Sequence, residues 1–352
     1  MTEVVIAGFG DERSYHAEEH AEYMGRRRLQ ISARLLSFCT EAKSDTLDKL
    51  SQDEFKNTTR RLQKQGKIRH ITQATPRQLS RYKRLLQEHH VHVWDIGSAL
   101  GKQYLGNKAD VEALPQILKN TVRVTHELGT QRVRIFNFYP GNKCEKVPEG
   151  SPKYREYWQQ AVAGSKLISE VFKYEGLVGY LEVEANLFGH NGESLMKFYD
   201  AIGAPANIVF YFDGANMVVQ ENAEVKDLSY PTYEAMIPRL GGLHIKDAVH
   251  VDSIPGVAVD EDHKWPFVQV GCGDSRYEDI FRDLIAEKRI REIEQRLDVA
   301  GLPRAVGVVL EPHLRMGGQF GGYTGSMYDV ALKKLVGLLD KAGIGHQPIN
   351  FN

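Results

Sequence analysis

Four residues that can bind a metal ion lie at the ends of four short hydrophobic stretches. They are Glu182 at the end of GYLE, Asp213 at the end of FYFD, His244 in GLHIKDA and Glu311 after GVVL. A single acid in such a place more often caps the following helix. Three carboxylates and an imidazole in succession, however, suit a divalent cation such as Mn²⁺, Mg²⁺, Co²⁺ or Zn²⁺. The pattern predicts one metal site where four strands end.

A second acid, Glu184, stands two residues after Glu182 in the stretch LEVEAN. Residues two apart point to the same side of a strand, so both carboxylates would project from one strand end.

Apolar strand-like runs alternate with amphipathic helical segments along the chain. Strands are predicted over residues 4–9, 29–39, 91–96, 133–138, 179–186, 208–212, 243–245 and 306–310. Helices are predicted over residues 14–28, 76–89, 110–128, 153–174, 194–202, 230–239, 277–298 and 327–341. This alternation is typical of parallel βαβ units. It predicts an α/β protein, and about eight units close most simply into a (β/α)8 TIM barrel.

A doubly wound open sheet is the rival architecture. It would require a glycine-rich phosphate-binding turn after the first strand, and GFGDE at residues 8–12 is too short for that motif. Residues from about 40 to 70 are polar and highly charged, which favours a solvated helix and loop inserted between barrel elements. We expect the 352 residues to form a single barrel domain, since such barrels often exceed about 250 residues.

The overall composition excludes several classes of protein. Lysine and arginine total 45 against 46 acidic residues, so the basic excess of a nucleic-acid-binding protein is missing. The three cysteines form no CxxC pair, which fits a reducing cytoplasm. The N-terminal residues lack the pattern of a signal peptide, and no apolar run reaches the roughly 20 residues that span a bilayer. We expect a cytoplasmic protein that binds neither nucleic acid nor membrane.

Several motifs together resemble those of the xylose-isomerase-like TIM barrel superfamily, which includes sugar phosphate isomerases and epimerases, inosose dehydratases and abasic-site endonucleases. The motifs are IFNFYPG, LEVEAN followed by LFG, FDGANM, HIKDA, VGCGD and LEPHL, with GFGDE, DIGSALGK and the tail GGQFGGYTG. The resemblance covers the first strand and most of the chain from Pro76 onward, and it is poor over residues 40–70.

The resemblance implies that Glu182, Asp213, His244 and Glu311 are the metal ligands. Glu182 rather than Glu184 matches the acid of the family's fifth strand, which leaves Glu184 as a substrate contact. Asn216 stands where epimerase relatives often carry a histidine that touches the substrate. An asparagine keeps the hydrogen-bonding capacity but cannot perform acid–base catalysis near neutral pH.

The resemblance also implies proton abstraction next to the carbonyl of a keto-sugar or related polyol. A divalent ion, most simply Mn²⁺, would stabilise the enediolate, while Glu182 and Glu311 would take and return the proton. The same chemistry can expel a β leaving group. The alternatives are therefore an inosose dehydratase or a lyase acting on 3-keto-C-glycosides, which in some relatives works with a small partner subunit. An oligomer is expected.

Four further residues near the motifs are candidate substrate contacts. Lys246 and Asp247 follow His244, and a Lys–Asp pair that braces the loop is the alternative interpretation. His313 lies two residues after Glu311, and His190 lies in the loop after the fifth strand. Two other classes stay open. An abasic-site endonuclease would need additional histidine ligands and a basic face for DNA, whereas a non-catalytic barrel would not need an intact set of four ligands.

Overall fold

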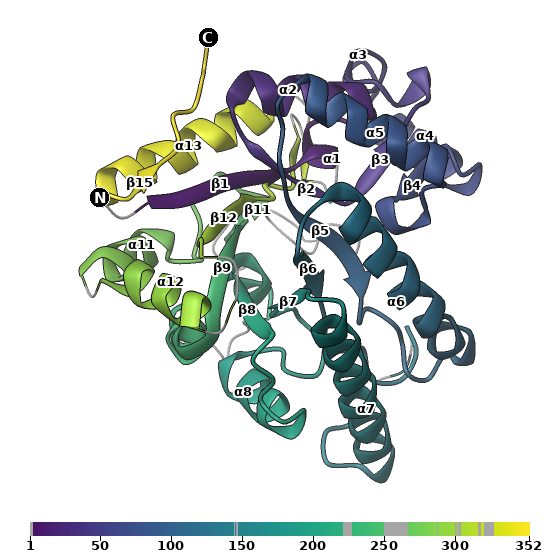
Figure 1. Cartoon of the computed structure of the whole chain (residues 1–352), viewed down its shortest axis with the longest axis vertical. Coiled ribbons are helices and arrows are strands. Elements are labelled where there is room, and N and C mark those ends of the chain that lie inside the picture. The colour runs from purple at the N-terminus through teal and green to yellow at the C-terminus, as the bar shows by residue number, and fades with distance from the viewer. Residues whose placement is uncertain are drawn as a thin grey trace, which may run out of the picture.

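Eight parallel strands form a closed barrel surrounded by helices (Figure 1). The computed structural model describes residues 3–143, 145, 147–220, 227–249, 267–286, 288–299, 301, 304–315, 318–319 and 327–352. The barrel strands are β1 (Glu3–Phe9), β2 (Gln30–Ala33), β5 (Val93–Leu100), β6 (Arg132–Ile135), β7 (Val178–Glu182), β8 (Ile208–Asp213), β9 (Leu240–Ile245) and β12 (Gly307–Leu310). Each strand pairs with the next, and β12 pairs with β1. The predicted (β/α)8 barrel is confirmed, and an open sheet is excluded.

The helices follow the predicted order. They are α1 (Gly10–Arg13), α2 (Ala17–Arg27), α5 (Pro76–Glu88), α6 (Lys108–Leu128), α7 (Pro152–Tyr174), α8 (Gly192–Ala201), α9 (Gly214–Val218), α10 (Ser229–Met236), α11 (Tyr277–Ala286), α12 (Arg289–Val299) and α13 (Met327–Ala342). The single helix predicted over residues 277–298 is wrong. Lys288 has φ of 56°, a left-handed conformation that a continuous helix does not contain. No helix in the described ranges is both long and apolar enough to cross a bilayer.

Local sequence signals explain where the helices begin. At α5, the Thr75 side chain accepts a hydrogen bond from the backbone of Gln78, whose side chain accepts one from the Thr75 N–H. This capping box satisfies two backbone donors, and Pro76 is preorganised for the first turn. Helix α5 then buries Leu79, Tyr82 and Leu86 at helical spacing.

Aromatic side chains fill the inside of the barrel below the predicted site. The Trp94 indole N–H donates a hydrogen bond of 2.7 Å to the hydroxyl of Tyr211. A Cβ added at Gly307 would lie 2.3 Å from the Trp94 ring, and one at Gly242 would lie 2.5 Å from the Tyr211 ring. Glycine at these two positions therefore gives the rings room, and the packed rings form a rigid floor.

Residues 35–70 form an insertion between barrel strands β2 and β5, as expected. The strand predicted over residues 29–39 is in fact two strands, β2 in the barrel and β3 (Leu35–Ser37) outside it. β3 pairs in antiparallel fashion with β4 (Ile68–His70), and between them lie η1 (Thr40–Ala42), α3 (Ser44–Leu47) and α4 (Gln52–Lys64). The insertion has its own small core and sits at the outer edge of the barrel, next to α5 (Figure 1).

Short elements complete the described chain. They are the 3₁₀ turns η2 (Ile71–Gln73) and η3 (Ile237–Arg239), and the strands β10 (Asp247–Ala248), β11 (Phe267–Val268), β13 (Leu314–Arg315), β14 (Gly318–Gln319) and β15 (Gly345–His346). β10 pairs in antiparallel fashion with β11, just beyond the end of barrel strand β9. Most of the motif GGQFGGYTG lies outside the described residues.

Candidate metal centre and active site

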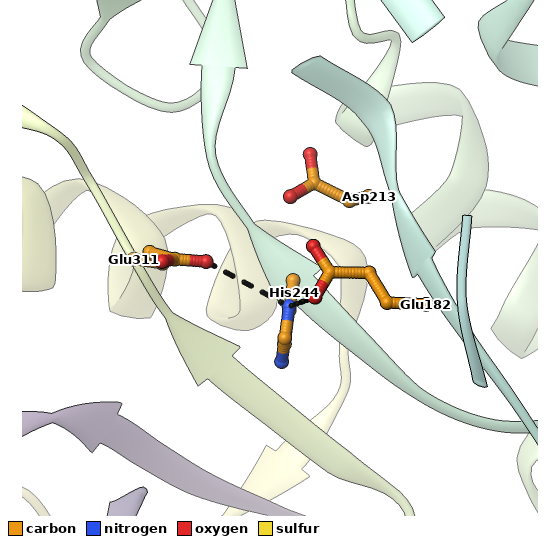
Figure 2. A group of neighbouring side chains, drawn as sticks. All are labelled: Glu182, Asp213, His244 and Glu311. Carbon is orange, nitrogen blue, oxygen red and sulfur yellow. Dashed lines mark ion pairs between the residues drawn. The ribbon is translucent and has the colours of Figure 1, made fainter. Parts of the chain in front are cut away.

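The four predicted ligands converge at the carboxyl end of the barrel (Figure 2). Glu182 ends the fifth barrel strand, Asp213 ends the sixth, His244 lies near the end of the seventh and Glu311 directly follows the eighth. All four side chains are buried, and each offers one ligand atom such that these atoms lie within 4.8 Å of one another. The strand-end pattern thus brings together the residues that the sequence singled out.

Strand periodicity and packing aim His244 at this cluster. Gly242 and His244 are two apart on β9, so they face the same side of the strand. The imidazole packs between two aromatic rings, with its centroid 4.1 Å from that of Tyr211 and 5.4 Å from that of Phe9. The aromatic floor therefore fixes the orientation of the ring.

The cluster fits a divalent cation. Nδ1 of His244 lies 3.2 Å from Oε2 of Glu182 and 3.7 Å from Oε2 of Glu311 (Figure 2). Neither nitrogen of this buried ring forms a hydrogen bond with any residue in the described part of the chain. A buried polar atom without a partner is costly. A cation between the imidazole and the carboxylates would supply that partner, and three oxygens with one nitrogen suit Mn²⁺ or a similar ion.

Charges around the site keep two of the carboxylates ionised. Burial favours a raised pKa for both Glu182 and Glu311, but other groups outweigh it. His244 and Arg134 hold the pKa of Glu182 well below its ordinary value, and Arg34 does the same for the pKa of Glu311. For Asp213, burial prevails over Lys246 and raises the pKa to about 6.

Two buried arginines complete the site, and the sequence interpretation missed both. The Arg134 guanidinium lies 3.2 Å from Oε2 of Glu182 and 3.7 Å from Oε2 of Glu311, so it bridges these carboxylates. Arg34, just after β2, contacts Glu311 as well as the carboxylates of Asp11 and Glu12. The sequence held a signal for Arg134, since Arg132 and Arg134 are two apart in the apolar run RVRI and so share one face.

Lys246 and Asn216 connect the ligands to one another. Nζ of Lys246 lies 2.9 Å from Oδ2 of Asp213 and donates a hydrogen bond of 3.0 Å to Oδ1 of Asn216. The Asn216 amide donates to Oε1 of Glu182 at 3.2 Å, while its backbone N–H donates to Oδ1 of Asp213 at 3.1 Å. Asp213 therefore caps α9 with one oxygen and faces the site with the other.

Glu184 is close to the cluster but outside it. Its carboxylate accepts a hydrogen bond of 2.6 Å from the Tyr139 hydroxyl and lies 2.6 Å from Nζ of Lys102. Glu184 also lines the pocket beside the cluster. Glu184 therefore faces the pocket from beside the cluster, and its role in substrate binding stays a prediction.

A pocket of about 420 Å³ opens directly onto the site. Eight of the residues discussed above line it together with His313, namely Arg34, Lys102, Arg134, Glu182, Glu184, Asn216, Lys246 and Glu311. His313 receives support from the Glu12 carboxylate, 2.9 Å from its Nδ1. This pocket is large enough for a sugar-sized ligand.

Two candidate contacts lie elsewhere. The Asp247 carboxylate accepts backbone hydrogen bonds from Gly271, Gly273 and Ser275, so it braces the loop after β11. His190 is not among the residues that line the pocket, and its carbonyl accepts a hydrogen bond from Gln220. The structure thus brings Glu184, Asn216, Lys246 and His313 to the pocket, but not Asp247 or His190.

The chain belongs to the xylose isomerase-like TIM barrel family, whose model matches residues 60–295. The predicted resemblance is thereby confirmed. The match begins within α4, so the first part of the insertion lies outside it. No curated protein matches the chain in sequence.

Solved structures share the fold at low sequence identity. A D-allulose 3-epimerase from Methylomonas sp. is 15% identical, with a TM-score of 0.56 over 97% of this chain and 99% of that one. The 3-keto-D-glucoside 4-epimerase of E. coli is 12% identical, with a TM-score of 0.53 over the same shares of the two chains. At these identities the likeness shows a common architecture.

Proposed function

We propose that this protein is a divalent-metal-dependent enzyme that abstracts a proton next to the carbonyl of a keto-sugar or related polyol, in the manner of an isomerase or epimerase. The observation that carries the proposal is the convergence of Glu182, Asp213, His244 and Glu311 at the end of the barrel. Membership of the xylose isomerase-like family and the sugar epimerases among the structural neighbours agree with it.

The four residues would hold the metal ion, with Mn²⁺ as our first choice. A bound divalent ion would supply Lewis-acid polarisation of the substrate's carbonyl and hydroxyl oxygens. Glu182 and Glu311 are the proposed proton-transfer groups, because their ionised carboxylates are the form that can accept a proton. They stand on strands five and eight, so the two carboxylates approach the pocket from different sides.

The other pocket residues would position the substrate. Lys246 and Asn216 form a hydrogen-bonded pair beside Asp213, and either can donate to a substrate hydroxyl. Glu184 accepts hydrogen bonds and would orient a second hydroxyl, and His313 also lines the pocket. Neither Asp247 nor His190 lines the pocket, so their roles in substrate binding stay predictions.

Hydrogen exchange in deuterated water tests this proposal. The Mn²⁺-loaded protein would be incubated with a panel of ketoses, inososes and 3-keto-glycosides, and the recovered sugars would be analysed by mass spectrometry. We expect deuterium to enter one of these substrates. Glu311→Gln should slow that exchange by roughly 10²–10⁴-fold, because it removes a proton-transfer group. Glu88→Gln is the matched control, since Glu88 is exposed on α5 far from the ligand cluster.

The reaction products distinguish an isomerase or epimerase from the lyase alternative. Loss of water or of an aglycone, with deuterium exchange, would identify a lyase acting by β-elimination at the same site. Absence of both exchange and elimination over the whole panel would contradict proton abstraction on these substrates. We further propose a single barrel domain in a cytoplasmic, oligomeric protein. A small partner subunit belongs to the lyase alternative alone.

A further inference from the structure

A second pocket, of about 540 Å³, continues from the active site toward the insertion. The two pockets share Arg34, Lys102, Arg134 and His313 in their walls, so they form one connected space. The metal ligands line one end of it, and α4 of the insertion lines the other. A ligand longer than a simple sugar could therefore occupy both.

Helix α4 presents two different faces. Phe55 and Leu62 are fully buried against the small core of the insertion. Lys56, Arg60 and Gln63 recur at intervals of four and three residues, so they lie along one stripe of the helix, and all three line the second pocket. The helix is thus attached by its apolar face while its basic stripe faces the barrel opening.

The second pocket is strongly basic. Arg34, Lys56, Arg60, Lys102 and Arg134 all line it, and none of its described lining residues is acidic. Burial lowers the pKa of His70 in its wall to about 4, so this imidazole is neutral near pH 7. The positive charge therefore comes from five lysine and arginine side chains.

These five cations differ in how they are paired. Arg34, Arg134 and Lys102 each contact carboxylates of the active site, namely Glu311, Glu182 and Glu184. Arg60 forms no ion pair with any residue in the described ranges. Arg60, on the insertion side, thus carries a positive charge that no carboxylate in the described ranges pairs with.

A hydrogen-bonding group without a partner stands in the same wall. Thr59 is only 9% exposed, and its hydroxyl forms no hydrogen bond with a described residue. A buried donor of this kind lowers stability unless a ligand satisfies it. The oxygen of an anion held by Arg60 and Lys56, which flank Thr59 along α4, is an acceptor that would do so.

We propose that this second pocket binds an anionic group of the substrate, a phosphate or a carboxylate, while the keto end of the substrate lies at the metal ligands. The inference rests on the proposed function for the identity of the keto end. It makes the insertion the part of the molecule that selects charged over neutral substrates. Arg60, Lys56 and Thr59 would contact the anion directly, and Lys102 also lines this pocket.

Calorimetric titration of the full-length, Mn²⁺-loaded protein tests this inference. The ligands would be D-fructose, D-fructose 6-phosphate, D-fructuronate and inorganic phosphate. Lys56→Gln/Arg60→Gln would be compared with Lys49→Gln/Lys64→Gln, which removes two positive charges from exposed positions of the same insertion that do not line the pocket. We expect wild type and control to bind phosphate and to bind at least one anionic ketose about tenfold more tightly than D-fructose. Lys56→Gln/Arg60→Gln should lose both phosphate binding and the preference for an anionic ketose.

Each result has a definite meaning. Tighter binding of D-fructose 6-phosphate than of D-fructuronate would identify the anionic group as a phosphate. The reverse order of affinities would identify it as a carboxylate. The inference would be overturned if the wild type did not bind phosphate. It would also be overturned if both double variants lost phosphate binding and the preference for anionic ketoses to the same extent. Metal content and deuterium exchange measured on the same samples test the proposed function separately. If the protein bound the metal ion and catalysed deuterium exchange but showed no preference for anionic ligands, only the inference about the second pocket would be refuted.

Discussion

The two ends of the connected pocket are built in opposite ways. At one end, Glu182, Asp213, His244 and Glu311 come from four neighbouring strands and are buried, and the aromatic floor of the barrel fixes the His244 ring. At the other end, a single helix outside the barrel supplies a basic stripe and is held by a small separate core. On our proposals, the barrel holds the reacting groups in place, while the inserted helix adapts the substrate range.

Destabilising the insertion alone is the strongest test of whether the two ends of the pocket are structurally independent. Phe55→Ala removes a fully buried ring from the small core formed with Tyr15, Leu47, Leu62 and Ile68. Such a cavity costs about 3–5 kcal/mol. We expect hydrogen–deuterium exchange by mass spectrometry to show lost protection across residues 44–70, with unchanged metal content and unchanged protection of the barrel strands.

Phe198→Ala is the matched control, because Phe198 is a fully buried phenylalanine of the main core. It should lower the free energy of unfolding of the whole barrel, as measured by urea denaturation. If Phe55→Ala instead released the metal ion, the two ends of the pocket would be one structural unit, and the comparison above would be wrong.

A smaller effect is expected where the insertion is attached to α2. The Glu19 carboxylate accepts hydrogen bonds from the backbone N–H of Ser44 at 2.8 Å and from the Ser44 hydroxyl at 3.1 Å. Burial favours a raised pKa for Glu19, but hydrogen bonds from Ser14 and Ser44 outweigh it and lower the pKa. Glu19→Gln should weaken the attachment by about 1 kcal/mol, a value reduced for its half-exposed position.

The direction of the pH dependence follows from that lowered pKa. The ionised carboxylate stabilises the folded state above the unfolded value of about 4.5, and this contribution is lost as the pH falls through the lower folded pKa. Exchange protection of α4 should therefore decrease below about pH 4.5 in the wild type. Glu19→Gln should show a weaker decrease there, and an identical decrease in both proteins would contradict the role of Glu19.

The cluster of Glu182, Asp213, His244 and Glu311 could be predicted from the sequence because strand ends are easy to recognise. Apolar runs that stop at an acid or a histidine, separated by helices, determine both the barrel and the place where these side chains meet. The match of four such stretches to one superfamily strengthened that prediction. Asn216 and Lys246 could also be predicted as site residues, because each lies three or fewer positions from a predicted ligand.

Contacts between distant segments could not be predicted in this way. Arg34 reaches Glu311 across 277 positions of the chain, and no local pattern encodes that pairing. The orientation of α4 depends on packing against Tyr15, which precedes the insertion, and Ile68, which lies in its last strand. From the sequence alone, its basic stripe therefore resembled an ordinary solvated face. The break near Lys288 was missed because neither glycine nor proline marks it.

Metal stoichiometry tests the central claim most directly. The wild type, Glu182→Gln, Asp213→Asn and the surface control Glu88→Gln would be equilibrated with Mn²⁺, dialysed and analysed by inductively coupled plasma mass spectrometry, with folding checked by circular dichroism. We predict one tightly held equivalent in the wild type and the control, and a large loss in both ligand variants. A folded wild type that retains no divalent ion, or ligand variants that retain a full equivalent, would contradict the account.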